Sequence, residues 1–153
     1  MNKLELKVPP VVLFLIALVL IDRIAEIFYT FDIPLPLPLL VFAGCFVVSG
    51  FVGLAGIVEF RRAKTTVHPG KPENASTIVS SGIFAYSRNP MYLGLLLLLF
   101  GFAYWQQNAL SMTVCLLFVG YMNRFQIEPE ERILEQYFGE DYLVYKRRVR
   151  RWI

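Results

Sequence analysis

Two short polar segments of this 153-residue chain carry side chains that could bind an ionic small molecule. In the first segment, Arg88 and Asn89 stand directly before Pro90 and a long apolar run. In the second, Glu130 and Glu131 follow the end of another apolar run. A cationic segment and an acidic segment that met in the fold could bind the two ends of a zwitterion.

The first segment has the composition of a helix N-terminus. Asn is among the best N-cap residues, and proline fits the first turn because its missing N–H has no intrahelical acceptor there. The free N–H groups of that turn favour an anion, and Arg88 places a formal positive charge beside them. Helix capping and a surface arginine explain the same residues without a ligand, so the sequence leaves both interpretations open.

The second segment also marks a helix start. Pro129 predicts a break or kink in the preceding helix, and an amphipathic helix begins near it. The dipole of that helix would favour acidic residues in its first turn, which explains Glu130 and Glu131 without a ligand. Arg124 lies about two turns before Glu131 and could supply the opposite charge that a zwitterionic ligand or an anionic acceptor requires.

The composition predicts that these segments are held by membrane helices. Hydrophobic residues make up 56% of the chain and charged residues 18%, whereas soluble domains contain about 45–50% and about 25%. The apolar residues gather in four blocks, which predict transmembrane helices over residues 9–29, 37–60, 90–105 and 109–125. We therefore expect an all-α integral membrane bundle of four transmembrane helices, followed by a C-terminal cytosolic or interfacial helix.

A chain of this length predicts a single domain, residues 1–153, with its site in segments 79–94 and 124–145. Lys and Arg gather in the loop before the third helix and in the C-terminal tail, and both other linkers lack them. The positive-inside rule then places both termini and that loop in the cytosol, as in a multi-pass protein of the bacterial inner membrane. The basic, aromatic tail predicts contact with anionic lipid, and we expect no nucleic-acid binding.

Two further groups of residues have more than one interpretation. Asp22, Arg23 and Glu26 form either a neutralised cluster at the outer membrane surface or a functional group inside the bundle. The first apolar block, residues 9–29, is expected to be a retained span rather than a signal peptide, because it ends in these charges and has no small-residue cleavage pattern. Small residues in the second block predict close helix packing, within the bundle or between subunits; they are Ser49, Gly50, Gly53 and Gly56.

The sequence predicts no metal site. Cys45 and Cys115 both lie inside apolar blocks, where buried cysteines behave as small apolar side chains. His68 is the one histidine of the chain, and no second ligand type stands near it. Any chemistry at the polar segments is therefore expected to proceed without a metal ion.

The polar segments resemble the isoprenylcysteine carboxyl methyltransferase and phospholipid methyltransferase family of membrane enzymes. The pattern G-x-x-x-Y-x-R-[HN]-P-x-Y-x-G is matched by Gly82, Tyr86, Arg88, Pro90, Tyr92 and Gly94. The pattern E-E-x-x-L is matched by Glu130, Glu131 and Leu134. The pattern F-G-x-x-Y-x-x-Y-x-x-x-V is matched by Phe138, Gly139, Tyr142, Tyr145 and Val149. The resemblance extends from about Thr65 to the C-terminus.

This resemblance implies methyl transfer from S-adenosylmethionine to a lipophilic carboxylate, amine or thiol at the cytosolic membrane face. The implied cofactor-binding residues are Val79, Gly82, Tyr86, Arg88, Asn89, Pro90, Tyr92, Glu130 and Glu131. The implied catalytic residues are Arg124, which would orient an anionic acceptor, and Glu130, which would act as a base for an amine or thiol. Isoprenylcysteine enzymes usually carry His where this chain has Asn89, and Asn cannot act as a base near neutral pH.

Two other classes of function fit the same chain. An NADPH-dependent membrane reductase of related architecture would need room for a dinucleotide. A non-catalytic membrane protein could keep the packing glycines without binding a cofactor. The identity of the acceptor and the oligomeric state depend on surface shape, which the residue pattern does not encode.

Overall fold

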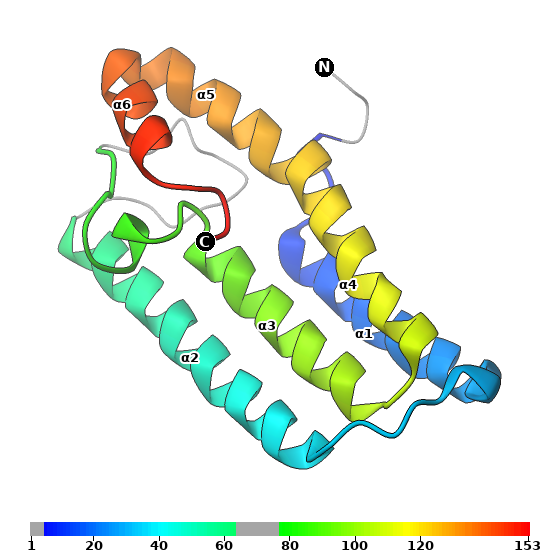
Figure 1. The fold of residues 1–153 in the computed structure, drawn as a ribbon. Helices are drawn as coiled ribbons and strands as arrows, with labels where there is room; N and C mark the ends of the chain where they lie inside the picture. Colours follow the sequence, from blue (N-terminus) through cyan, green and yellow to red (C-terminus); the bar gives the residue numbers. More distant parts are fainter. Residues whose placement is uncertain (1–4, 64–76) are drawn as a thin grey trace.

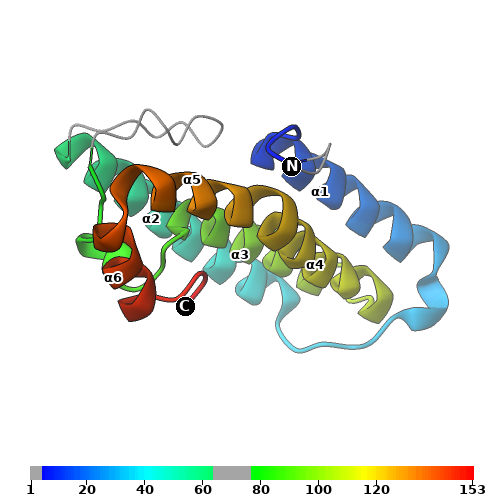
Figure 2. The same cartoon turned by 90° about the horizontal axis from the view of Figure 1, so that it is seen from above.

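The computed structural model describes residues 5–63 and 77–153, which form helices gathered around a central helix (Figures 1 and 2). In chain order the elements are α1 (Pro10–Ile27), η1 (Tyr29–Phe31), α2 (Pro38–Arg62), η3 (Gly82–Ala85), α3 (Pro90–Trp105), α4 (Ala109–Tyr121), η4 (Met122–Ile127), α5 (Glu128–Phe138) and α6 (Glu140–Arg148). Within the described residues, extended pairing is limited to one bridge between Asp32 and Asn108. The all-α prediction is therefore confirmed, while His68 and Thr65 lie outside the described residues.

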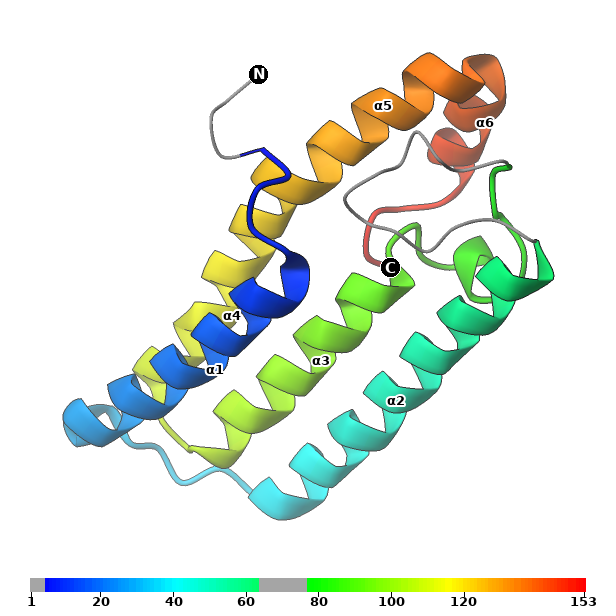
Figure 3. The same cartoon turned by 180° about the vertical axis from the view of Figure 1, so that it is seen from behind.

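Helix α3 is the central element of the bundle. The pair α1 and α4 packs against one side of it and α2 against the other (Figures 1 and 3). The main core lies between α1, α3 and α4 and includes Phe14, Ile21, Leu99, Phe118 and Met122. Pro90 starts α3 in its first turn, so the Arg88–Asn89 segment is fixed at one end of the best-packed helix.

Small residues bring α2 and α3 into close contact. The Ser49 hydroxyl donates a hydrogen bond to the Gly94 carbonyl at 2.7 Å. A Cβ atom on Gly56 would lie 3.3 Å from Met91, whereas one on Gly50 would meet nothing within 4 Å. The predicted small-residue surface thus serves packing within the bundle at Ser49 and Gly56, and Gly50 faces away from it.

Among the described helices, α2 is long and apolar enough to cross a membrane, and α3 is a shorter apolar helix. The predicted spans 37–60 and 90–105 agree with α2 and α3 to within two residues. Helix α1 carries three charges near its end, and α4 ends as an α-helix at Tyr121. The crossing of a membrane four times therefore stays a prediction.

The charged residues of α1 form a local cluster at the end of the bundle farthest from the polar segments. The Arg23 guanidinium pairs with Asp22 at 2.8 Å and with Glu26 at 2.5 Å, and all three side chains are exposed. The Gln106 amide donates to Asp22, and the buried Asn108 amide donates to Asp32. The cluster fits the interpretation as a neutralised surface group, because Arg23 pairs with both carboxylates and all three side chains are exposed. The two amide hydrogen bonds hold the linkers together at this end.

Helix α4 does not break before Pro129. It continues through the π-helical turn η4 into α5 without a loop, and Figure 3 shows the change of direction there. Pro129 lacks the N–H that would bond the Phe125 carbonyl in an α-helix, and the Leu6 N–H donates to that carbonyl at 3.0 Å instead. The predicted kink is present, and the N-terminal segment compensates for the missing hydrogen bond.

The predicted C-terminal helix is divided into α5 and α6. Gly139 separates them with φ of +54°, a backbone conformation that glycine adopts without strain. This turn directs α6 back over the segment before α3 (Figure 1). A second apolar cluster forms there between Tyr142, Tyr145 and Val149, with Ile78 and Phe138 packed against it.

Candidate functional site

The segment before α3 is held in place by a carboxylate of α2. Ser81 donates a hydrogen bond from its hydroxyl to Glu59 at 2.5 Å, and the Glu59 side chain is 12% exposed. Gly82 follows with φ of +56°, and a Cβ atom there would lie 2.6 Å from the Glu59 side chain. Glycine at this position therefore satisfies both the backbone conformation and the close approach of α2.

Arg88 joins the first polar segment to the second. Its side chain is 8% exposed, and its Nη2 atom donates to Glu131 at 2.6 Å. Its Nη1 atom donates to the carbonyls of Lys146 and Val149 at 2.8 and 2.9 Å. Among the described residues, the Arg88 Nε–H is a buried donor without a hydrogen-bond partner. A buried N–H without an acceptor is costly, so an acceptor at this position would stabilise the protein.

Glu131 is surrounded by cations. Besides Arg88, it accepts two hydrogen bonds from Arg151 at 3.0 and 2.9 Å, and Lys146 lies 3.4 Å away. Burial alone would raise the pKa of Glu131, but the hydrogen bond from Arg151 and the charge of Arg88 hold that pKa below its usual value. This carboxylate therefore stays ionised across the physiological pH range and anchors three basic side chains.

Glu130 lies in a different environment on the same helix turn. The Tyr92 hydroxyl and the Gln126 amide both donate to its Oε1 atom, at 2.7 and 2.6 Å. Burial raises the pKa of Glu130 to about 7, and the neighbouring charge of Glu131 acts in the same direction. The two hydrogen bonds lower this pKa but do not offset the burial. Glu130 can therefore exchange a proton near neutral pH.

The remaining predicted site residues lie in varied surroundings. Val79 is buried in the protein, Pro90 is buried in the first turn of α3, and the Tyr86 ring is 76% exposed. Asn89 occupies the N-cap position of α3, but its side chain makes no capping hydrogen bond. It donates instead to the Arg151 carbonyl at 3.0 Å. The predicted helix start at Asn89 and Pro90 is confirmed, whereas capping by the Asn89 side chain, one of the two interpretations left open, is not observed, because that side chain bonds to the C-terminal segment instead.

Arg124 lies at the edge of the site. Its guanidinium pairs with Glu128 at 2.9 Å, and its side chain is 53% exposed. The charge beside Glu131 that the sequence assigned to Arg124 comes from Arg88 and Arg151 instead. Glu128 also lies 3.7 Å from Arg151, so Arg124 is connected to the buried residues through one shared carboxylate.

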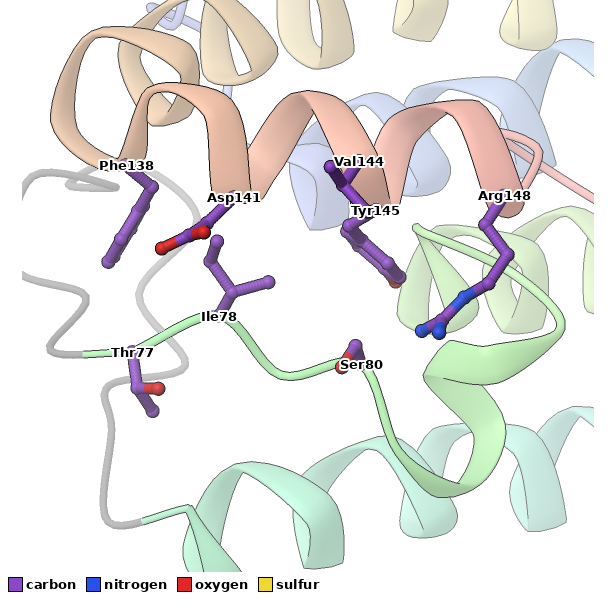
Figure 4. A pocket seen from close by; sticks show the side chains of 8 residues that line it. All are labelled: Thr77, Ile78, Ser80, Phe138, Asp141, Val144, Tyr145 and Arg148. Atoms are coloured by element: carbon purple, nitrogen blue, oxygen red, sulfur yellow. The ribbon is translucent and has the colours of Figure 1, made fainter.

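A pocket of about 480 Å³ lies between α6 and the segment that leads to η3, and neither Arg88, Glu130 nor Glu131 belongs to its lining (Figure 4). Its wall from α6 contains Asp141, Tyr145 and Arg148, and its opposite wall contains Thr77, Ile78 and Ser80. The Tyr145 hydroxyl donates to the Phe84 carbonyl at 2.8 Å, which fixes the distance between the two walls. Cavities of about 300–1,000 Å³ are typical of small-molecule sites.

Several residues that the structure places at the candidate site belong to none of the sequence motifs. Gln126 could have been found, because it stands four residues before Glu130, on the same helix face. Arg151 lies well beyond the second motif and Asn123 stands directly before Arg124, and no spacing pattern indicates the partners of either residue. Within the part of the chain that the structure describes, no group of three or more His, Cys, Asp or Glu side chains could hold a metal ion.

Known proteins are similar to part of this chain. A protein of Haemophilus influenzae, described as uncharacterized, is 44% identical over 63 residues, which are 41% of this chain and 100% of that protein. The mouse protein-S-isoprenylcysteine O-methyltransferase is 38% identical over 73 residues, or 48% of this chain and 26% of the enzyme. The enzyme of that name from Saccharomyces cerevisiae is 29% identical over 79 residues, or 52% of this chain and 33% of the enzyme.

The chain thus spans between about a quarter and a third of the length of these two methyltransferases. No solved structure matches it. Residues 39–141 match the phospholipid methyltransferase family. This range contains all but the first residue of α2, the whole of α3, α4 and α5, and both the Arg88–Glu131 and the Tyr92–Glu130 contacts. The match covers more than half of the sequence, and the chain belongs to the phospholipid methyltransferase family.

Proposed function

We propose that this protein transfers a methyl group from S-adenosylmethionine to a lipophilic acceptor at the cytosolic face of a membrane. One observation carries the proposal. The two polar segments meet through the Arg88–Glu131 pair at 2.6 Å and the Tyr92–Glu130 hydrogen bond at 2.7 Å. The paired residues are 43 and 38 positions apart in the sequence. Membership of a methyltransferase family supports the same conclusion.

The residues of the site fit the chemical groups of this cofactor. The buried Arg88 Nε–H, which lacks a partner among the described residues, would donate to its carboxylate. Glu130, in the charged form, would attract its amino group or its positively charged sulfur. The pocket between Tyr145 and Ser80 would hold its nucleoside, with the Asp141 carboxylate accepting from ribose hydroxyls. When bound, the cofactor supplies a methyl group that is activated by the adjacent sulfonium.

The residues of the chain then act by orientation and by proton removal. Correct alignment of the reactants alone is worth roughly 7–11 kcal/mol in such reactions. A carboxylate acceptor needs no base. An amine or thiol acceptor must lose a proton, and the Oε2 atom of Glu130 can take it, since no described residue donates a hydrogen bond to that atom.

Arg124 is proposed to orient an anionic acceptor at the membrane surface. Its pair with Glu128 is exposed, and exposed pairs contribute only about 0–1 kcal/mol. An acceptor anion could therefore replace Glu128 as the partner of Arg124 at little cost. A lipophilic acceptor would reach the site from the bilayer, beside the exposed apolar surface of α2.

Ligand stabilisation tests this function directly. We expect S-adenosylhomocysteine, and not NADPH, to raise the unfolding temperature of the purified protein in detergent. Tyr92→Ala and Glu130→Ala should weaken its binding, as measured by calorimetry, whereas Tyr137→Ala, an exposed residue on α5, should not. Undiminished affinity in both variants would exclude Tyr92 and Glu130 from the proposed cofactor site, and stabilisation by NADPH would favour a reductase.

Transfer of a radiolabelled methyl group then identifies the acceptor. The assay uses total membrane lipids and prenyl-cysteine analogues as separate acceptors, with S-adenosylmethionine as the labelled donor. Label in the lipid fraction assigns a phospholipid acceptor, and label in the analogue assigns a carboxylate. Cofactor binding without transfer to either fraction would show that the acceptor belongs to another class.

A further inference from the structure

The C-terminal segment Val149–Trp152 lies between the two polar segments. It follows α6 and returns to the N-terminal end of α3, where the chain ends in Figures 1 and 3. The match to the family model ends at residue 141, and Arg151 and Trp152 belong to none of the three motifs that carry the resemblance. Their contacts therefore describe a part of the site that family membership does not assign.

One side of this segment bonds to the residues before α3. The Arg88 N–H donates to the Arg150 carbonyl at 3.0 Å. The Asn89 side chain donates to the Arg151 carbonyl at 3.0 Å, and the buried Ser87 hydroxyl donates to the same carbonyl at 3.4 Å. The amide of Asn89 is thus oriented by the backbone of the C-terminal segment.

The other side bonds to the helices that carry the acidic segment. The Arg151 guanidinium donates from Nε and Nη2 to the two oxygens of Glu131, at 3.0 and 2.9 Å. The Trp152 indole N–H donates to the Asn123 side chain at 3.0 Å, and its ring packs against the main core. Two adjacent residues therefore attach the segment to α5 and to the turn η4.

We infer that Val149–Trp152 forms the third wall of the site and that Arg151 is a positioning residue. Its guanidinium fixes the orientation of Glu131, while its carbonyl fixes the orientation of Asn89. This inference rests on the proposed function, because it assigns to Arg151 the arrangement of groups that bind the cofactor. It also explains how Asn can stand at position 89, where isoprenylcysteine enzymes usually carry His. The side chain at this position donates a hydrogen bond, which an Asn amide can do.

The side-chain chemistry explains why arginine is required. A guanidinium presents parallel N–H groups that match both oxygens of a carboxylate, whereas a lysine ammonium acts as a point charge. Glu131 is 5% exposed and Arg151 is 30% exposed. Without the two parallel hydrogen bonds, Glu131 would keep only its contacts with Arg88 and Lys146 among the described residues. The orientation of its carboxylate plane would then no longer be fixed.

The test compares Arg151→Gln with Arg147→Gln. Arg147 lies four residues earlier, and its pair with Glu140 is exposed, so the control removes the same charge from the same tail. We expect Arg151→Gln to weaken S-adenosylhomocysteine binding at least tenfold by calorimetry, Arg151→Lys to weaken it less, and Arg147→Gln to leave it unchanged. Equal affinity in Arg151→Gln and the wild type would overturn the inference.

A second measurement does not depend on the cofactor. In a Trp105→Phe background, Trp152 is the remaining tryptophan. Arg151→Gln should shift its fluorescence to longer wavelength, because release of the segment moves the indole into a more polar environment, and Arg147→Gln should not. An unchanged spectrum in Arg151→Gln contradicts the positioning role. Absence of cofactor binding by the wild type would instead contradict the proposed function.

If Arg151→Gln does not fold, Arg151→Lys decides the question, because it keeps the charge but not the two parallel bonds. Weaker cofactor binding by a folded Arg151→Lys protein supports the inference. Wild-type affinity together with an unshifted Trp152 spectrum in that variant would refute it.

Discussion

Glu130 and Glu131 are adjacent residues whose carboxyl groups respond to burial in opposite ways. Burial raises the pKa of Glu130 to about 7. The hydrogen bonds from Tyr92 and Gln126 lower that pKa, but both donors are neutral and they do not offset the burial. Burial also acts on Glu131, but Arg151 and Arg88 more than offset it and lower the pKa. One carboxylate is therefore a fixed structural charge, while its neighbour can gain or lose a proton near neutral pH.

Glu130→Gln should change the pH dependence of stability. The pKa of Glu130 is raised in the folded state, so the folded protein binds more protons than the unfolded chain above the ordinary carboxyl pKa. The wild type should then lose stability relative to Glu130→Gln as the pH rises from about 5 to 8, by up to about 3 kcal/mol. Thermal unfolding in detergent at several pH values measures this difference.

The control for this experiment is Glu140→Gln, because the Glu140 side chain is 71% exposed. The difference between Glu140→Gln and the wild type should not change over the same pH range. A constant difference between Glu130→Gln and the wild type would mean that Glu130 is charged throughout, and its assignment as a base would fail.

Glu131→Gln should destabilise the protein strongly. The substitution leaves the buried Arg88 guanidinium without its carboxylate, and loss of one partner of a buried ion pair costs roughly 3–5 kcal/mol. The same change in the exposed Glu140–Arg147 pair should cost at most about 1 kcal/mol. Denaturant titrations of both variants test the contrast, and equal effects would show that the Arg88–Glu131 pair contributes no more than a surface pair.

The residues that meet at the candidate site could be found from the motifs, but their pairing could not. The motifs indicated Arg88, Tyr92, Glu130 and Glu131, and the structure brings these four into one network. The choice of Arg88 and Arg151, rather than Arg124, as partners of Glu131 depends on how α6 and the C-terminal segment fold back over the segment before α3. No local spacing specifies how the chain returns there, so the sequence alone does not specify which side chains pair with Glu131.

At the scale of elements, prolines and charged residues in the sequence mark several helix boundaries. Pro38 and Pro90 start α2 and α3, and the basic pair at the end of α2 marks its polar terminus. The junction of α4 and α5 was less predictable, because the π-helical turn and the Leu6–Phe125 hydrogen bond depend on the N-terminal segment. Proline indicates that the regular helix is disturbed, but not which group replaces its hydrogen bond.

Gly101→Ala should weaken the contact between α2 and α3. An added Cβ would lie 2.6 Å from the Cβ of Cys45, so the helices would have to separate. Overpacking of this kind costs about 1–3 kcal/mol. Gly120→Ala on α4 is the matched control, because its Cβ would meet nothing within 4 Å. Unfolding temperatures measure both, and an unaltered temperature for Gly101→Ala would mean that α2 is not packed as described.

At the scale of the whole molecule, the two ends of the bundle differ in chemistry. One end contains the polar segments, α5, α6 and most of the described basic residues. The other contains the exposed Asp22–Arg23–Glu26 cluster and the linker with Tyr29. Between them, α1, α2 and α4 expose large apolar side chains, among them Leu15, Phe51 and Leu116. An exposed apolar belt between two polar ends is the surface that a bilayer covers.

This arrangement predicts that Tyr29 and Tyr137 lie on opposite sides of the membrane. Both side chains are exposed, at 70% and 61%, and neither belongs to the proposed site. In a background in which alanine replaces both native cysteines, Tyr29→Cys should react with a membrane-impermeant maleimide in intact cells. Tyr137→Cys should react only after the membrane is permeabilised, since the excess of Lys and Arg places its end in the cytosol. The cysteine-free background is the control, and labelling of both positions from the same side would exclude the four-helix crossing and separate the proposed site from the cytosolic supply of cofactor.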